Sequence, residues 1–407
     1  YDRPGLHAVA QAAGLPFDKA QELAFCLEAL CDAVELQATN RDFTYSSLGA
    51  AIQEYFTRAV GPDPDPLDKR LFNWHVSNLE YANATNLDQL SLQHWNQDDP
   101  FTFKGAHCLL RGGFGGMAAI MSRNVELCGG RVLLAHRVDA IEMSSPSPHP
   151  GIVERNAAVT VRGVKHVVPA TANAGLGPLS STSEASEELF SISADFAVIT
   201  LPLGVLKAGS TKFSPPLPGP KLAAIDRLGF GVLDKVVLEF ETCFWDHAFP
   251  VIGHMSVEPG EHYMFVNLVR STGRPILASL ISGRCAERME RCSDGEVVEG
   301  CMVALRSVYR LRPVPNPVAS VVTRWRQDPL AGGSYSFIRA GSTPSDIQAL
   351  AAPEAGGLLG FAGEATTTTH LASAHGAVLT GRREAQRLAR LVSSSWPKAP
   401  PSQAPVT

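Results

Sequence analysis

The stretch LLGFAGE (Leu358–Glu364) carries the strongest local signal in this sequence. Its apolar residues predict a buried strand that ends at Gly363, and a Thr-rich turn then leads into a helix through about residue 390. A helix N-terminus presents unpaired N–H groups and about half a positive charge, which suits a phosphate or another electron-rich group. Glu364 could accept hydrogen bonds from sugar-type hydroxyls, but a Glu in a first helical turn also stabilises a helix without any ligand.

A second apolar run, FAVITLPLGVL (Phe196–Leu206), predicts another buried strand that enters a turn at Pro202. Mixed strands and helices, with a strand-to-helix crossover late in the chain, predict an α/β or α+β fold. Further predicted strands cover residues 131–136, 157–169, 234–240, 263–269 and 275–282, and predicted helices cover 19–36, 71–84 and 297–309.

Breaks in the pattern separate these elements. The sequence GPDPDP (61–66) cannot continue a helix. Residues 144–151 form a predicted loop, and the small, polar segment 170–188 reads as a surface insertion. Residues 394–407 carry four prolines and predict a disordered tail.

The composition excludes several classes of protein. Hydrophobic residues make up 45% of the 407 residues and charged residues 18%, which is enough apolar material for a sizeable core. The net charge of −5 argues against strong nucleic-acid binding, and no apolar run is long enough to span a membrane. The eight cysteines contain no C-x-x-C pair, which favours a reducing compartment, and no signal peptide is visible.

Weaker motifs each leave two interpretations open. GGFGGMAAIM (112–121) is typical of a Gly-rich turn before a helix rather than of a dinucleotide-binding loop, because no βαβ pattern accompanies it. NQDDPF (96–101) is either a solvated turn or an acidic wall for a cationic substrate. Lys235, within an apolar strand, is either a packed side chain or a group that orients a water and exchanges protons. No metal site is predicted, and His370 and His375 are interpreted as structural.

Together these motifs closely resemble the amine oxidase domain of the lysine-specific histone demethylase family, and the plant-like members most of all. The pattern TLPLGVLK and FAGE is shared by flavin amine oxidases in general, whereas the two earliest matching stretches are closer to the demethylase branch. The matching stretches are Trp74–Ala84, Leu90–Phe101, Thr200–Lys207, Pro215–Phe240, Arg324–Phe337, Phe361–Thr367 and His375–Ala385.

The resemblance implies a two-domain flavin amine oxidase fold in which an FAD-binding domain is interleaved with a substrate-binding domain of mixed sheet and helices. The implied substrate domain comprises residues 1–101 (helical part) and 232–343 (sheet part). The implied FAD-binding domain comprises residues 102–231 and 344–393, and 394–407 form the tail.

The resemblance also assigns residues to roles. It implies that Lys235 holds a water near the reactive flavin nitrogen, and that Glu364 is the carboxylate at the end of the FAD-binding strand. The other implied cofactor contacts are Val138, Thr200, Pro202, Trp325, Gly363, Ser373 and Ala374. The implied substrate contacts are Asn78, Ala82, Asp98, Asp99, His107 and Tyr335.

Some features depart from the family pattern. The family's N-terminal βαβ unit with its phosphate loop, and its SWIRM domain, do not occur in these residues, so the resemblance predicts an N-terminally truncated chain whose own FAD binding is weak. Leu330 stands where animal members have Trp, Asn96 replaces an acid, and HLASAHGA (370–377) departs from the usual sequence. No helical arm for a corepressor fits between the early helices.

The implied activity is FAD-dependent oxidative demethylation of mono- and dimethyl-lysine on histone H3, in the nucleus, releasing formaldehyde and hydrogen peroxide. The implied partners are the methylated H3 tail and a chromatin corepressor complex, with no membrane and no strong nucleic-acid binding. Two alternatives stay open: a polyamine oxidase, which shares the flavin chemistry, and a non-catalytic chromatin-binding scaffold.

Overall fold

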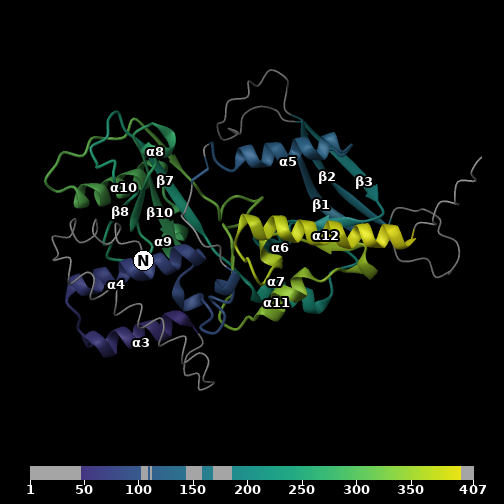
Figure 1. The fold of residues 1–407 in the computed structure, drawn as a ribbon, viewed down its shortest axis with the longest axis horizontal. Helices are drawn as coiled ribbons and strands as arrows, with labels where there is room; N and C mark the ends of the chain where they lie inside the picture. The colour runs from purple at the N-terminus through teal and green to yellow at the C-terminus, as the bar shows by residue number, and fades with distance from the viewer. Residues whose placement is uncertain (1–46, 102–108, 111, 144–157, 168–185, 396–407) are drawn as a thin grey trace, which may run out of the picture.

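The computed structural model describes residues 47–101, 109–110, 112–143, 158–167 and 186–395. The predicted helix over 19–36, His107 and the predicted loop at 144–151 therefore lie outside the described residues. Residues 170–185 of the predicted insertion also lie outside them, whereas 186–188 belong to strand β3 (Ser186–Ala194). Of the predicted tail, 396–407 lie outside, and the prediction was wrong for 394–395, which belong to helix α12 (Ala374–Ser395). Figure 1 shows strands and helices in two groups. One group is built around β7 (Leu233–Glu239) and β10 (Ile276–Ser282), and the other around β1 (His136–Met143) and α12 (Ala374–Ser395). Helices and mixed sheets together confirm the α/β class.

The larger sheet is antiparallel, with strand order β11-β7-β10-β9-β8. The interior strand β7 pairs with β10 on one side and β11 on the other, so its backbone groups are satisfied on both edges. The predicted strands over 234–240, 263–269 and 275–282 are confirmed here. The strands are β7 (Leu233–Glu239), β8 (Val251–Gly253), β9 (Met264–Asn267), β10 (Ile276–Ser282) and β11 (Ala319–Val322).

Helices cover both faces of this sheet. The inward side chains of α10 (Asp294–Val308) pack with Val236 and Leu238 of β7 in one apolar cluster. On the opposite face, Trp74 of α4 (Pro66–Asn83) packs with Tyr263 and Leu280. The remaining helices of this group are α3 (Leu48–Val60), α8 (Val269–Thr272) and α9 (Gly283–Met289).

The predicted break at 61–66 separates α3 from α4. Asp65 caps α4, because its Oδ1 accepts a hydrogen bond from the Leu67 amide at 2.8 Å, and Pro66 occupies the first helical position, where its missing N–H costs nothing. The predicted helix over 71–84 is thus confirmed and begins five residues earlier.

The second group contains a four-stranded sheet of order β3-β2-β1-β5 and a separate parallel pair, β4 and β13. The prediction of a strand at 131–136 was wrong, because the strand begins at His136, and β3 was not predicted. The strands are β1 (His136–Met143), β2 (Val159–Val167), β3 (Ser186–Ala194), β4 (Ala197–Ile199), β5 (Lys212–Ser214) and β13 (Leu359–Phe361).

Four helices pack around β4 and β13, and a fifth lies apart. The buried Lys221 of α7 donates hydrogen bonds to the carbonyls of Ala349, Leu350 and Ala352, which ties α7 to the end of α11. Its ammonium also lies 3.9 Å from the centre of the Phe361 ring. The helices are α6 (Leu203–Ala208), α7 (Gly219–Arg227), α11 (Pro344–Ala351), α12 (Ala374–Ser395) and the outlying α5 (Gly115–Leu127).

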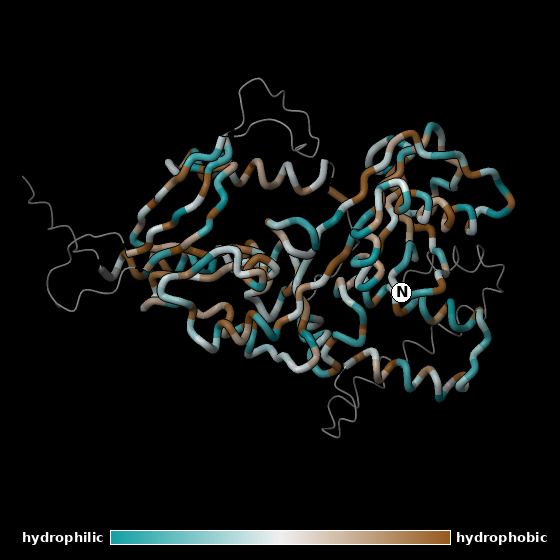
Figure 2. The backbone as a smooth tube through the Cα atoms, turned by 180° about the vertical axis from the view of Figure 1, so that it is seen from behind, coloured by the Kyte–Doolittle hydropathy of each residue, from teal (hydrophilic) through white to brown (hydrophobic). Residues whose placement is uncertain are grey.

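The helix α5 begins in the Gly-rich stretch, so the prediction of a turn before a helix is confirmed. None of its residues is buried, and Figures 1 and 2 show it on the outside of the molecule. Its exposed apolar side chains include Met117, Ile120 and Val125. Of the helices described, none has the length and apolarity needed to cross a membrane.

The two groups are joined by a short antiparallel pair, β6 (Gly229–Phe230) and β12 (Ser336–Phe337). The chain enters the larger sheet directly after β6, and β12 follows the connection that carries Trp325 and Tyr335. This pair brings the motif at 324–337 next to the ends of β4 and β13. The division into domains given above remains a proposal.

Candidate functional site

A cavity of about 300 Å³ opens at the carboxyl ends of the parallel strands β4 and β13. In open α/β sheets, ligands bind outside the carboxyl ends of the strands. Four residues selected from the sequence meet here: Thr200, Pro202, Gly363 and Glu364. The complete lining is Ile199, Thr200, Leu201, Pro202, Leu203, Leu206, Phe230, Ser334, Leu350, Phe361, Ala362, Gly363, Glu364, Ala365, Thr366, Ala377 and Gly381.

The backbone at Gly363 suits close approach by a ligand. Its φ of 127° lies in a region that L side chains rarely adopt, and a Cβ built at this position would meet nothing within 4 Å. The Gly363 N–H donates to Thr380 Oγ1 of α12 at 3.0 Å, which fixes the strand end against the helix. Glycine here therefore leaves both the conformation and the space that a bound group needs.

Glu364 is held by hydrogen bonds within the protein. Ser336 Oγ donates to Glu364 Oε1 at 2.6 Å, and the amide of Ala372 donates to Oε2 at 3.0 Å. Burial raises the pKa of this carboxyl, against the lowering effect of these hydrogen bonds. A carboxylate has about four lone-pair positions, so at least one stays open to a ligand hydroxyl.

The helix α12 supplies cavity residues that the sequence reasoning missed. Ala377 and Gly381 lie one helical turn apart and both line the cavity. A side chain on Gly381 would point into space with no atom within 4 Å. The spacing of small residues in HGAVLTG (375–381) is the signal in the sequence that could identify these two positions.

Ser373 and Ala374 lie at the start of α12. Ser373 Oγ accepts the Gly376 amide at 3.1 Å and donates to the His370 carbonyl at 2.7 Å, which is a capping arrangement. Neither residue is part of the cavity lining given above. Val138 lies farther off, in β1, where it packs on the apolar cluster beneath β4 and β13.

The acidic turn, residues 96–101 with Asp98 and Asp99, lies beside the start of α12. Phe101, in the 3₁₀ turn Asp99–Phe101, approaches His370 with ring centres 6.3 Å apart, and His370 lies 4.8 Å from His375. The charge of Asp98 acts on His375 and raises its pKa, while burial, the larger effect, lowers it. Thus the structure brings Asp98 to the same end of α12 as Ser373, although the two stretches are far apart in sequence.

Lys235 is half-buried in β7, an interior strand of the larger sheet. Its amide donates to Thr323 Oγ1 at 2.8 Å, and its carbonyl accepts from the Thr323 amide at 3.0 Å. Burial lowers the pKa of its ammonium, and the neighbouring Asp234 opposes that effect. Alternation along β7 places Lys235 on the face opposite to Asp234 and Val236.

Trp325 and Tyr335 are the two aromatic residues that the sequence predicts at the site. The side chain of Trp325 is 40% exposed and is accessible to a ligand. Tyr335 is partly buried, and its hydroxyl donates to the carbonyl of Tyr81 in α4. Asn78 and Ala82 are one turn apart on α4, the helix that also contains Tyr81. The hydrogen bond from Tyr335 to Tyr81 therefore joins this helix to the connection between β11 and β12, which carries Trp325.

Two buried carboxyls, Asp234 and Glu290, hold the backbone of the Trp325 segment. Asp234 Oδ1 accepts the Trp325 amide at 3.1 Å and the Thr323 hydroxyl at 2.8 Å. Glu290 accepts the next two amides along the chain at 2.8 and 3.0 Å. Burial and the nearby Glu290 raise the pKa of Asp234 to about 7. The environment of Asp234 therefore favours the protonated form of its carboxyl.

Replacing Asp234 by Asn should remove this proton dependence. The folded-state pKa of Asp234 lies above its unfolded value of 3.8, so the stability it contributes is full below pH 4 and is lost as the pH rises to about 7. An Asn side chain is neutral at any pH, so no charge has to be buried at this position when the pH rises. We expect Asp234→Asn to increase the free energy of unfolding by about 2 kcal/mol at pH 8 and to change it little at pH 4.

Urea unfolding at pH 4, 6 and 8 measures this, with the exposed Asp63→Asn as the matched control. Parallel pH profiles for wild type and Asp234→Asn would show that folding does not raise the pKa of Asp234.

The comparisons with known proteins agree with this geometry. The family described as flavin containing amine oxidoreductase matches residues 6–389, so the chain belongs to this family. Its cofactor is accordingly FAD. In the solved structures, wild-type putrescine oxidase bound to putrescine matches with a TM-score of 0.63 at 15% identity, covering 91% of this chain and 76% of that one. That similarity confirms the flavin amine oxidase fold.

Relatives of known name share more of the sequence. Lysine-specific histone demethylase 1 homolog 3 of Oryza sativa subsp. indica is 35% identical over 87% of this chain. Protein FLOWERING LOCUS D of Arabidopsis thaliana is 36% identical over 84%, and the possible lysine-specific histone demethylase 1 of Drosophila melanogaster is 36% identical over 79%. The matched regions span 40%, 39% and 35% of those proteins, respectively.

Proposed function

We propose that this chain is the oxidising part of a histone lysine demethylase that acts on mono- and dimethyl-lysine of histone H3 in the nucleus. The observation that carries the proposal is the meeting of Thr200, Pro202, Gly363 and Glu364 around one cavity at the ends of β4 and β13. The names of the relatives support the substrate class. The implied partners are the methylated H3 tail and a chromatin corepressor complex.

The residues present fit a flavin cofactor. The cavity has space beside Gly363 and Gly381, and Glu364 keeps room for one more hydrogen-bond donor. A volume of 300 Å³ is at the lower end for ligand pockets and suits one portion of a dinucleotide. When bound, FAD accepts a hydride from the substrate and passes the electrons to O₂, which yields hydrogen peroxide. Val138, Trp325, Ser373 and Ala374 are the further proposed contacts.

The proposed reaction converts the N-methyl group of the substrate to formaldehyde. A C–H bond of this group breaks with loss of a hydride to the flavin, and the nitrogen lone pair forms a C=N bond. Water then hydrolyses this imine to formaldehyde and the less methylated amine. Lys235 would hold the water and move its proton, because burial favours the neutral amine form of this side chain.

The substrate tail carries positive charge, and the acidic turn supplies the complementary charge. We propose that Asp98 and Asp99 attract the tail and that Asn78, Ala82, His107 and Tyr335 line its path. Asp98 lies beside the start of α12, which places negative charge close to the proposed cofactor contact Ser373. An opposite charge near a cationic ligand raises the association rate and affinity, and salt screens the effect.

Neutralising the acidic turn should weaken peptide binding. We expect Asp98→Asn/Asp99→Asn to raise the KM for a methylated H3 peptide about three- to tenfold at low salt and to flatten its dependence on salt, with kcat little changed. The measurement is steady-state peroxide release at 20–300 mM NaCl, with Asp63→Asn as the control. An unchanged KM and salt dependence would leave the segment as a solvated turn.

Removing the Glu364 carboxylate should weaken FAD binding. We expect Glu364→Ala to raise the Kd for FAD at least tenfold, since a charged hydrogen-bond acceptor at the ligand contributes about 1.5–3 kcal/mol. Flavin fluorescence titration measures the Kd, and thermal unfolding is followed in parallel. Ser336→Ala, which removes one internal donor to Glu364, is the control. If both variants lose stability equally and bind FAD like wild type, Glu364 is only a structural tie.

Product analysis tests the function itself. FAD-loaded protein with a dimethyl-lysine H3 peptide should release formaldehyde and hydrogen peroxide in equal amounts. Bound FAD without either product from any methylated H3 peptide would favour the chromatin-binding scaffold.

A further inference from the structure

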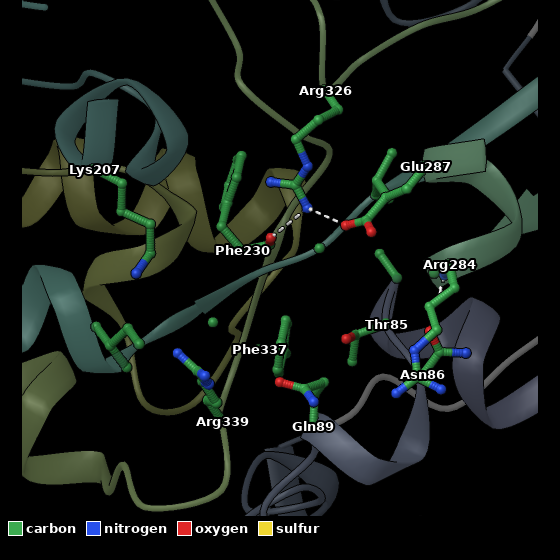
Figure 3. A pocket seen from close by; sticks show the side chains of 16 residues that line it. Thr85, Asn86, Gln89, Lys207, Phe230, Arg284, Glu287, Arg326, Phe337 and Arg339 are labelled. Carbon is green, nitrogen blue, oxygen red and sulfur yellow. Dashed lines mark hydrogen bonds and ion pairs between the residues drawn. The ribbon is translucent and has the colours of Figure 1, made fainter. Parts of the chain in front are cut away.

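A second cavity, of about 390 Å³, borders Phe230 and collects positive charge. Figure 3 shows four cationic side chains around it, each from a different segment. Lys207 comes from α6, Arg284 from α9, Arg326 from the connection between β11 and β12, and Arg339 from the residues just after β12. None of these side chains has a role in the function proposed above.

Carboxylates offset only part of this charge. Glu287 is the one acidic residue in the lining, and its Oε1 lies 3.6 Å from Arg326 Nη2. Arg284 pairs with Asp88 outside the lining. Among the ion pairs of the part of the chain that the structure describes, none includes Lys207 or Arg339, although the charge of Asp226 acts on Lys207. The lining therefore carries a formal charge of +3, from four cations and one acid.

The unpaired cations lie close enough to interact. Lys207 Nζ donates to the carbonyl of Asp226 at 2.8 Å, which holds it at the cavity. Burial lowers the pKa of Lys207 most, the charge of Asp226 opposes this, and the charges of Arg339 and Arg326 lower it further. Lys207, Arg284 and Arg339 are exposed to solvent, so their charges are open to a ligand. Like charges gathered around a concave site raise the local positive potential, which attracts an anion.

The packing keeps the shape of the cavity fixed. Its floor contains the buried rings of Phe230 and Phe337. A Cβ on Gly229 would lie 2.4 Å from the Phe337 ring, and a Cβ on Gly231 would lie 2.3 Å from the Ala84 carbonyl, so neither position accepts a side chain. Polar groups complete the lining, namely Thr85, Asn86 and Gln89, and Figure 3 shows Asn86 beside Arg284 and Gln89 near Arg339.

We propose that this cavity binds a compact anion with two or more phosphate groups, with Lys207 and Arg339 as its principal contacts. One guanidinium group can donate two parallel hydrogen bonds to the oxygens of a phosphate, and a lysine ammonium adds a compact positive charge. Arg326 adds charge beside them, because its guanidinium already donates to the carbonyls of Gly332 and Phe230 and lies 3.6 Å from Glu287. The cavity size matches a small ligand rather than a nucleic-acid duplex.

Calorimetric titration of the full chain with inorganic pyrophosphate tests the proposal, at constant ionic strength and with saturating FAD present. We expect saturable binding of one pyrophosphate. Lys207→Gln/Arg339→Gln should weaken it at least tenfold, and Arg339→Ala alone should weaken it about threefold. The control is Lys212→Gln/Arg270→Gln, which removes two exposed cations outside the cavity and should leave the affinity unchanged.

Further arms identify the source of the phosphate. Equal affinity for pyrophosphate and for ADP indicates that the cavity recognises the phosphate groups alone. Tighter binding of ADP indicates that the rest of the nucleotide also makes contacts. Both results support the proposal. Four results would overturn the proposal. They are the absence of saturable pyrophosphate binding to the wild type, equal binding by the double variant, binding of sulfate as tight as that of pyrophosphate, and displacement of FAD by pyrophosphate.

Discussion

Lys235→Met should slow substrate oxidation by about 10²- to 10⁴-fold, the usual contribution of a positioned acid–base group. Lys235 lies in β7, the strand hydrogen-bonded to both β10 and β11, so its backbone position is firmly set. Burial lowers the pKa of its ammonium, which brings proton exchange closer to neutral pH. Methionine keeps most of the length and the apolar contacts of the stem but cannot exchange a proton.

The measurement is the rate of flavin bleaching by a dimethyl-lysine peptide under anaerobic conditions, followed by peroxide release after O₂ is added. The Kd for FAD and for the peptide should stay within about threefold of wild type, because the change removes a proton carrier rather than a binding contact. Lys212→Met, which alters an exposed strand lysine in β5, is the matched control. Wild-type rates in Lys235→Met would show that Lys235 is a packed strand residue only.

A trimethyl-lysine peptide should give no product, which is the largest difference the proposed function predicts. Oxidation to an imine needs a lone pair on the nitrogen, and mono- and dimethyl-lysine expose one after deprotonation. A quaternary trimethylammonium has none at any pH. We therefore expect peroxide release from the trimethyl peptide to be at background, at least 10³-fold below the dimethyl peptide.

The trimethyl peptide should still bind, because its positive charge is kept and the acidic turn attracts charge rather than a particular methylation state. Inhibition of dimethyl-peptide turnover by the trimethyl peptide shows this binding. Peroxide and formaldehyde from the trimethyl peptide would exclude the imine route.

The elements that fix the site were predictable because their apolar runs are strong. The runs at 196–206 and 358–364 gave β4 and β13, and the Gly–Glu junction after β13 identified the edge where the cavity lies. The prediction of a strand at 131–136 was wrong. The sequence RVLLAH has the apolar content of a strand, but this part of the chain forms strand pairs only from His136 onward. Local composition does not encode where a neighbouring strand begins to pair.

Other features depend on contacts between distant residues and left no local signal. The pairing of Asp234 with Glu290 joins positions 56 residues apart, and the four cations of the second cavity come from positions 207 to 339. Ala377 and Gly381 line the first cavity only because α12 packs against the end of β13 through Thr380. The individual roles assigned to Lys235, Glu364 and the substrate contacts remain predictions.

Side-by-side turnover of a dimethyl-lysine H3 peptide and of spermine tests the central claim most directly. The protein is loaded with FAD, each substrate is mixed with it anaerobically, and the bleaching of flavin absorbance is followed in a stopped-flow instrument. We predict rapid bleaching by at least one dimethyl-lysine H3 peptide, with formaldehyde and peroxide in equal amounts after O₂ is admitted, and bleaching by spermine at least tenfold slower. Bleaching by spermine without bleaching by any H3 peptide would contradict the account and identify a polyamine oxidase.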